Sequence, residues 1–262
     1  MDYIQKASRH ILPRENNFFG AGTRVEPKQI QYSQTKRMAV PRSFLNKNFV
    51  LTEDTPDFVA RAYKVMRIQV MKKMRENNGN TLAVSSPSPN EGKTLTAINL
   101  AISLAKHLDY TVLLADLDFY RPSLHKYFGF TPEKGIEDYL LNGTPLNKIM
   151  INPGIERLVL LPTRSQVKVT SELLSSNRML DLVHELKSRY TSRFVIFDLP
   201  PVLVGDDVMA FSSFAEATLL VMEENNTRRK DLKHAATMLK DANLIGTVLN
   251  RSNEGLLVTQ NY

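Results

Sequence analysis

The sequence contains no cysteine and no tryptophan among its 262 residues. Without cysteine, a disulfide framework and a thiolate metal site are both excluded. The sequence also lacks an apolar run of the roughly 20 residues needed to span a bilayer. Its first residues lack the apolar core of a signal peptide. These absences lead us to expect a soluble, cytoplasmic protein.

Positive charge is unevenly distributed along the chain. The formal net charge is +7, and residues 1–50 hold nine Lys or Arg against three Asp or Glu, which accounts for six of the seven. Such a segment either contacts nucleic acid or an anionic membrane, or is simply a solvated extension. No basic platform with interspersed aromatics is visible, so we expect no specific nucleic-acid partner. We predict a basic, largely disordered leader over 1–54, one domain over 55–251 and a short polar tail over 252–262.

The stretch from residue 81 to residue 105 is typical of a phosphate-binding loop. An apolar run, Thr81 to Val84, ends in a Ser, Pro and Asn-rich segment, and Gly92, Lys93 and Thr94 then open an amphipathic helix. Backbone N–H groups at a helix N-terminus favour an anion, a Lys here reaches the β- and γ-phosphates, and a Thr ligates Mg²⁺. Pro87 stands where the common pattern has Gly, and an ordinary strand-to-helix turn is the alternative interpretation.

Acidic residues follow two further apolar strands. Asp116 and Asp118 end the run that starts at Thr111, and Asp198 ends the run Phe194 to Phe197. Strand residues two apart point to the same side, so both carboxylates of the first pair can face the carboxyl edge of the sheet, where open α/β sheets bind ligands. An acid in the position of Asp198 holds the Mg²⁺ shell in phosphate-loop enzymes, whereas the alternative is that each Asp only caps a turn.

Strand-like and helix-like segments alternate throughout 81–250. This alternation predicts an α/β fold with a mainly parallel sheet, covered by helices on both faces as in P-loop NTPases. Lys93, Thr94 and the three aspartates then all lie at carboxyl ends of strands. Together they form a set that ATP and Mg²⁺ require, with Thr94 and Asp198 positioning the metal and Asp116 or Asp118 left to accept a proton.

Three segments together resemble the bacterial tyrosine kinases of capsule and exopolysaccharide loci, most of all the cytoplasmic autokinases of exosortase-linked loci. They are Ser-Pro-Asn-Glu-Gly-Lys-Thr (88–94), Leu-Leu-Ala-Asp-Leu-Asp with Arg-Pro (113–122) and Val-Ile-Phe-Asp-Leu-Pro-Pro (195–201), which look like the Walker A, A′ and B motifs. The resemblance covers about 55–251, and the double-Asp element is its most specific part.

The resemblance implies a protein-tyrosine autokinase that transfers the γ-phosphoryl group of ATP to tyrosine and regulates polysaccharide polymerisation or export. It implies Asp116 as the base, Asp118 as a helper of the metal shell and Asp198 as the Walker B acid. It also implies a transmembrane polysaccharide co-polymerase as activating partner, recruitment to the inner face of the plasma membrane, and a homo-oligomeric ring. The nucleotide would contact the following residues, with Asn250 near the adenine: Ser88, Pro89, Asn90, Glu91, Gly92, Lys93, Thr94, Thr96 and Asn250.

The sequence departs from this family in ways that keep two alternatives open. The ring-forming helix usually carries Glu, Arg and Arg at three-residue steps, but Arg61, Lys64 and Arg67 stand there. The usual C-terminal tyrosine cluster is reduced to Tyr262, our candidate phosphoacceptor, with Tyr3 and Tyr32 as rivals. The alternatives are a partition-type ATPase switch, whose second signature Lys is missing from 87–91, and a non-catalytic assembly factor of an export complex.

Overall fold

The computed structural model describes residues 35–107, 109–188 and 192–252, all within the second of two units of the chain, 31–262. The strands in this part are β1 (Lys36–Arg37), β2 (Thr81–Ser85), β3 (Thr111–Asp116), β4 (Ile151–Asn152), β5 (Leu158–Leu161), β6 (Arg193–Asp198), β7 (Ala217–Glu223) and β8 (Leu244–Asn250). The helices are α1 (Arg42–Lys47), α2 (Asp57–Glu76), α3 (Lys93–Ala105), α4 (Leu124–Tyr127), α5 (Ile136–Asn142), the 3₁₀ turn η1 (Leu146–Lys148), α6 (Thr170–Leu174), α7 (Asn177–Ser188), α8 (Asp207–Ser212) and α9 (Arg229–Met238).

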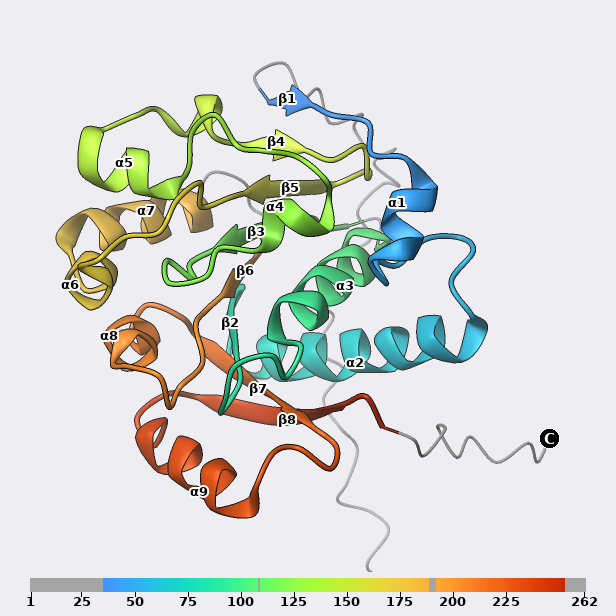
Figure 1. Cartoon of the computed structure of the whole chain (residues 1–262), viewed down its shortest axis with the longest axis vertical. Coiled ribbons are helices and arrows are strands. Elements are labelled where there is room, and N and C mark those ends of the chain that lie inside the picture. Colours follow the sequence, from blue (N-terminus) through green and yellow to red (C-terminus); the bar gives the residue numbers. More distant parts are fainter. Residues whose placement is uncertain (1–34, 108, 189–191, 253–262) are drawn as a thin grey trace, which may run out of the picture. The chain divides into compact units, whose positions relative to one another are not determined.

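The described strands form one sheet in the order β1-β4-β5-β3-β6-β2-β7-β8 (Figure 1). Every neighbouring pair in it is parallel except β4 and β5. Parallel neighbours need crossover connections, and the helices between the strands supply them. The predicted mainly parallel α/β fold is therefore confirmed.

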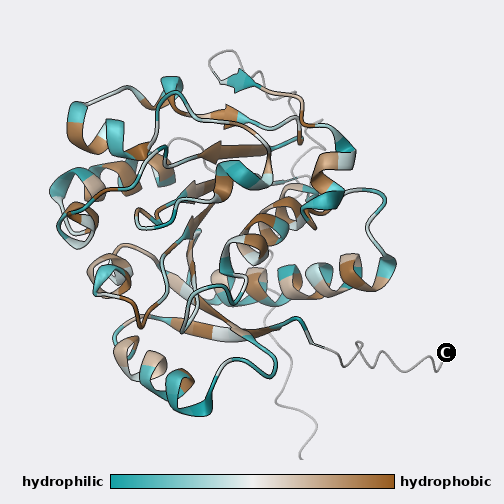
Figure 2. Cartoon of the chain, in the orientation of Figure 1, coloured by the Kyte–Doolittle hydropathy of each residue, from teal (hydrophilic) through white to brown (hydrophobic). Residues whose placement is uncertain are grey.

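Alternation along the central strands explains why helices cover both faces of this sheet. On β6, Phe194 and Ile196 join one buried cluster while Val195 and Phe197 join the other. A strand that is buried on both faces has no polar side, which is why β6 is apolar from Phe194 to Phe197, between its polar end residues (Figure 2). Helices α2 and α3 pack in the cluster of Phe194, and α7, α8 and α9 pack in the cluster of Phe197.

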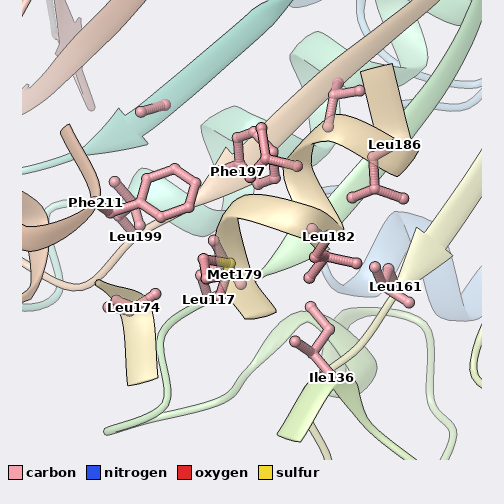
Figure 3. Close-up of a cluster of buried hydrophobic side chains, with 14 of the residues drawn as sticks. Leu117, Ile136, Leu161, Leu174, Met179, Leu182, Leu186, Phe197, Leu199 and Phe211 are labelled. Atoms are coloured by element: carbon pink, nitrogen blue, oxygen red, sulfur yellow. The ribbon is translucent and has the colours of Figure 1, made fainter. Parts of the chain in front are cut away.

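Figure 3 shows part of the cluster around Phe197, where Met179, Leu182 and Leu186 of α7 meet the sheet. Leu117 belongs to the same cluster and is fully buried. Its backbone N–H donates to the carbonyl of Asp198 at 2.9 Å. Because Leu117 is anchored in this way, the two aspartates on either side of it are held at the carboxyl edge of the sheet.

The prediction of a disordered leader is wrong for residues 35–54. β1 pairs with β4, and Leu45, Val50 and Leu51 are buried. The Asn99 side chain on α3 accepts from the Leu51 N–H at 2.8 Å and donates to the Phe49 carbonyl at 3.0 Å. These elements are too short to show periodicity, so tertiary contacts order them where no sequence pattern does. Residues 1–34 lie outside the described part.

The segment from Ser171 to Leu186 has apolar residues at the spacing of one helix, but it forms two helices, α6 and α7. Two serines separate them. The Ser176 hydroxyl donates to the Leu173 carbonyl at 2.7 Å and accepts from the Met179 N–H at 3.2 Å. Serine side chains compete in this way with the backbone hydrogen bonds of a helix, which ends one helix and begins the next.

In the described part of the chain, no helix combines the length and the apolar character that crossing a membrane requires.

Candidate functional site

Strand register brings the predicted acids together at one edge of the sheet. Asp116 on β3 lies opposite Asp198 on β6, and Asp198 lies opposite Val84 on β2. The loop between β2 and α3 leaves the sheet at this same edge. Three segments that are far apart in the sequence therefore end side by side, as the predicted motifs require.

The loop before α3 keeps its shape through backbone conformation and buried contacts. Asn90 and Gly92 have φ of 66° and 91°, both in the left-handed region. Glu91 is 1% exposed and accepts from the Ser88 N–H at 2.8 Å and from the Thr227 hydroxyl at 2.5 Å. The Asn250 side chain donates to the Glu91 carbonyl at 3.0 Å. The hydrogen bonds of Glu91 and Asn250 thus hold the loop in this conformation.

Gly92→Ala is expected to abolish nucleotide binding. A Cβ on Gly92 would lie 2.0 Å from Asn250 Nδ2, and the residue has φ of 91°. The left-handed backbone alone costs an alanine about 1–2 kcal/mol, and relief of the clash must move the Asn250 side chain away from the Glu91 carbonyl that it holds. Binding of a fluorescent ATP analogue at 20 °C tests this, with the melting temperature as the control for folding. Unchanged affinity would contradict this account of the loop.

Lys93, the first residue of α3, lies between two carboxylates. Its Nζ is 2.8 Å from Asp118 Oδ2 and 3.3 Å from Asp198 Oδ1. Thr94 donates its hydroxyl to Asp198 Oδ2 at 2.6 Å and accepts from the Ser123 hydroxyl at 3.3 Å. The contacts of Lys93 and Thr94 with Asp118 and Asp198 join different motifs of the sequence, so the three motifs form one cluster.

Asp116 lies deeper than the others and holds the segment that follows β3. It is fully buried, and its carboxylate accepts backbone N–H groups of Asp118, Ser123 and Leu124 at 3.0–3.1 Å. A carboxylate that organises three N–H groups fixes the path of the chain around it. Asp116 therefore positions Asp118 and the residues up to Leu124.

Burial and charge shift the pKa values in this cluster. Burial pulls the pKa of Lys93 down, but Asp198 and Asp118 outweigh it and raise that pKa above its ordinary value. Burial, followed by the charge of Asp198, raises the pKa of Asp116 to about 7. Burial also raises the pKa of Asp198, against the opposing effect of Lys93. A cation bound beside these buried carboxylates would therefore stabilise their charged forms.

Stability is expected to fall as the pH rises from about 4 to about 7. Between the unfolded pKa of 3.8 and the folded value of about 7, folded Asp116 keeps a proton that the unfolded chain has released. The free energy of unfolding falls with rising pH wherever the folded state binds more protons than the unfolded chain. Here the total fall is about 2–4 kcal/mol. Urea unfolding at pH 5 and pH 8 measures the difference. Asp116→Asn should reduce it, and an equal slope in that variant would contradict the assignment.

A cavity of about 440 Å³ opens beside this cluster. Its volume lies within the range of small-molecule sites. Six of the residues predicted for the site line it: Pro89, Asn90, Gly92, Lys93, Thr94 and Asp118. The other predicted residues are not part of this lining: Ser88, Glu91, Thr96, Asp116, Asp198 and Asn250. Tyr262, like Tyr3 and Tyr32, lies outside the described residues.

Several lining residues were not assigned a role from the sequence. They lie between β3 and the end of α4, or directly after β8: Tyr120, Arg121, Ser123, Lys126, Tyr127 and Arg251. Arg121, Lys126 and Arg251 add three cations to Lys93 around the cavity, against the single carboxylate of Asp118. Arg251 could have been assigned to the cavity from the sequence, because it follows the carboxyl end of a strand. The place of Tyr127 in the lining is known only from the fold.

The donors around the cavity fit a phosphate-bearing ligand with a divalent cation. Cations and the start of a helix of 13 residues face the same space. In the described part of the chain no group of three or more His, Cys, Asp and Glu gathers as a preformed metal centre. A hydroxyl and carboxylates beside a phosphate site suit Mg²⁺, which keeps waters and shares phosphate oxygens.

Comparisons with known proteins agree with this geometry. Residues 82–261 match the family described as CobQ/CobB/MinD/ParA nucleotide binding domain. The chain is 30% identical over 206 residues to a putative tyrosine-protein kinase in the cps region of Klebsiella pneumoniae, covering 78% of this chain and 28% of that protein. It is 24% identical to the putative tyrosine-protein kinase CapB of Staphylococcus aureus, covering 82% of this chain and 93% of that one.

A solved structure supports the same relationship. The kinase domain of the Escherichia coli tyrosine kinase ETK superposes with a TM-score of 0.68 at 26% identity, over 87% of this chain and 91% of that domain. The resemblance to bacterial tyrosine kinases that the three motifs indicate is therefore confirmed. The chain spans less than a third of the length of the Klebsiella relative.

Proposed function

Because the chain belongs to the CobQ/CobB/MinD/ParA family of nucleotide-binding domains, we propose that it is an ATP-dependent protein-tyrosine kinase that regulates exopolysaccharide polymerisation or export. One observation supports this proposal above the others. Lys93, Thr94, Asp118 and Asp198 from three separate motifs are in direct contact beside a cavity of about 440 Å³. The similarity to proteins named as tyrosine kinases supplies the reaction class.

Lys93 is the residue that binds the phosphates in this proposal. In the described structure it is held by Asp118 and Asp198, so a triphosphate exchanges these carboxylate contacts for phosphate oxygens. Arg121, Lys126 and Arg251 line the same cavity and add charge for the rest of the nucleotide. Thr94 and Asp198 would hold Mg²⁺. When bound, Mg²⁺ neutralises the charge that develops on the phosphates.

Asp118 is the carboxylate best placed to accept the proton of a tyrosine hydroxyl. It lines the cavity, whereas Asp116, the base that the sequence favoured, is used by three backbone N–H groups. In the transfer, the tyrosine oxygen bonds to the γ-phosphorus while the bond to the β–γ bridging oxygen breaks. The phenolic proton passes to the carboxylate, and ADP leaves with the bridging oxygen. Tyr262 remains the candidate acceptor.

We further propose that the kinase acts with a transmembrane polysaccharide co-polymerase at the inner face of the plasma membrane, and that it forms a homo-oligomer. The support is the resemblance to tyrosine kinases of capsule loci. The charge at Arg61, where the ring-forming helix of such kinases usually has Glu, predicts a ring contact of different chemistry.

A phosphotyrosine assay tests the proposed function. The full chain is incubated with ATP and Mg²⁺, with and without the cytosolic segment of the co-polymerase from the same locus, and phosphotyrosine is mapped by mass spectrometry. Phosphotyrosine that depends on ATP supports the kinase. Turnover of ATP without phosphotyrosine would replace it with an ATPase switch, and nucleotide binding without turnover would leave an assembly factor.

A further inference from the structure

Helix α4 carries part of the lining of the nucleotide cavity but is only one turn long. It spans Leu124–Tyr127, and Lys126 and Tyr127 at its end line the cavity. A single helical turn has little stability of its own, so packing against other elements must fix its position. The contacts that hold α4 therefore also determine where Lys126 and Tyr127 lie.

Asp116 holds the start of α4. Its carboxylate accepts the N–H groups of Ser123 and Leu124, both at 3.0 Å. The link from this start to α3 is weaker, because the Ser123 hydroxyl lies 3.3 Å from the Thr94 hydroxyl, whereas a strong O–H···O hydrogen bond is about 2.7–2.8 Å long. Neither contact involves the end of α4, where two of the cavity-lining residues lie.

A side chain from the segment before α2 holds the end of α4. Gly129 follows this end with φ of 68°, and its N–H donates to the Lys126 carbonyl at 3.2 Å. A Cβ on Gly129 would lie 2.8 Å from Cε1 and Cζ of Phe44 in α1, so the aromatic ring rests on the glycine backbone. Glycine permits both this close approach and the left-handed φ, because it has no Cβ. Phe44 thus covers the turn that ends α4.

The same segment is also attached to α3. The Asn99 side chain accepts from the Leu51 N–H at 2.8 Å and donates to the Phe49 carbonyl at 3.0 Å. Asn99 is 2% exposed and lies on the helix that begins with Lys93. Residues 41–51, called here the brace, therefore connect α3 to the end of α4, and both helices border the nucleotide cavity (Figure 1).

We propose that the brace positions Lys126 and Tyr127 for the nucleotide, and that nucleotide binding and the order of the brace are coupled. Phe44 and Asn99 are its positioning residues. Without the ring of Phe44 the end of α4 has more conformations available, and a nucleotide must restrict them when it binds, which lowers its affinity. Coupling of this kind is reciprocal, so a bound nucleotide must stabilise the brace in return. The inference rests on the nucleotide binding of the proposed function and not on transfer to tyrosine.

Phe44→Ala tests the brace. Anisotropy of a fluorescent ATP analogue, measured with Mg²⁺ and the full chain at 20 °C, should show binding weakened at least about fivefold. Phe44→Leu keeps an apolar contact with Gly129 and should recover part of this loss. Unchanged affinity in Phe44→Ala would overturn the proposal.

Met74→Ala is the matched control for stability. Met74 is 2% exposed and belongs to the same buried cluster as Leu45 of α1. It lies at the opposite edge of the sheet, where its Cε is 3.1 Å from the position of a Cβ on Gly79, before β2. Its truncation should lower the melting temperature at least as much as Phe44→Ala, while the affinity changes less than about twofold. Equal losses of affinity in both variants would reveal a general effect of stability and refute positioning.

Hydrogen exchange tests the reciprocal effect. In the full chain saturated with Mg²⁺ and a non-hydrolysable ATP analogue, peptides that cover the brace should exchange at least about threefold more slowly, whereas peptides from α7 should be unchanged. This protection should disappear in Asn99→Ala, which removes the link to α3. Equal exchange with and without nucleotide would rule out the coupling. If the unchanged chain binds no nucleotide, the proposed function fails together with this inference, whereas binding that is insensitive to Phe44 removes the inference alone.

Discussion

Lys93→Met is expected to reduce phosphotyrosine formation by about 10³-fold or more. The methionine fills similar space but removes the charge that contacts Asp118 at 2.8 Å and Asp198 at 3.3 Å. A triphosphate would then enter a site whose nearest groups are carboxylates, which repel it. Phosphotyrosine blots and binding of a fluorescent ATP analogue measure the two losses.

Lys93→Met is also expected to lower the free energy of unfolding by about 3–5 kcal/mol, because it removes one partner of a buried ion pair and leaves the other. Asp118 is 3% exposed and Asp198 is fully buried, so both would lose their counter-charge without gaining water. The double variant Lys93→Met with Asp118→Asn should regain part of this stability while remaining inactive. That outcome separates loss of chemistry from loss of folding.

Lys126→Met is the matched control for Lys93. Lys126 also lines the nucleotide cavity, but it is exposed and forms no ion pair within the described residues. We expect a reduction in rate of less than about tenfold, since one exposed cation contributes little. Equal losses in both variants would mean that Lys93 acts only through the overall field of the cavity, which would contradict its assigned role.

The sequence allowed the sheet and the position of the site to be predicted because both depend on local patterns. Apolar runs predicted β2, β3 and β6, and the acids that follow β3 and β6 predicted one edge. Parallel register then places Asp116 opposite Asp198 without further information. Motifs at strand ends are therefore the part of a nucleotide site that a sequence reveals most directly.

The remaining features could not be predicted because they depend on contacts between distant segments. Glu91 was expected to contact the nucleotide, yet its carboxylate binds Ser88 and Thr227. The sequence does not indicate that Thr227 lies beside the loop. Residues 35–54 were assigned to a disordered leader because their order comes from contacts with distant segments, among them β4 and Asn99 on α3, which no pattern in that segment reveals.

Asp118→Asn is expected to lower the rate of phosphotyrosine formation by about 10²–10⁴-fold while ATP binding stays within a few-fold of its original value. The amide keeps an oxygen for the Arg121 N–H, which donates to Asp118 Oδ1 at 2.9 Å, so the backbone there is preserved. It cannot accept the phenolic proton. Removal of a negative charge from the cavity wall also favours a triphosphate, which opposes any loss of affinity.

Asp116→Asn should behave differently and thereby decide which aspartate is the base. An amide offers one oxygen where the carboxylate accepts N–H groups on both, from Asp118 on Oδ1 and from Ser123 and Leu124 on Oδ2. The segment from Asp118 to Leu124 should loosen, so the melting temperature falls and KM for ATP rises together with a lower kcat. If Asp116→Asn instead lowers kcat alone and Asp118→Asn has the smaller effect, Asp116 is the base. Measurement of kcat, KM and melting temperature for both variants therefore separates a residue that reacts from one that positions it.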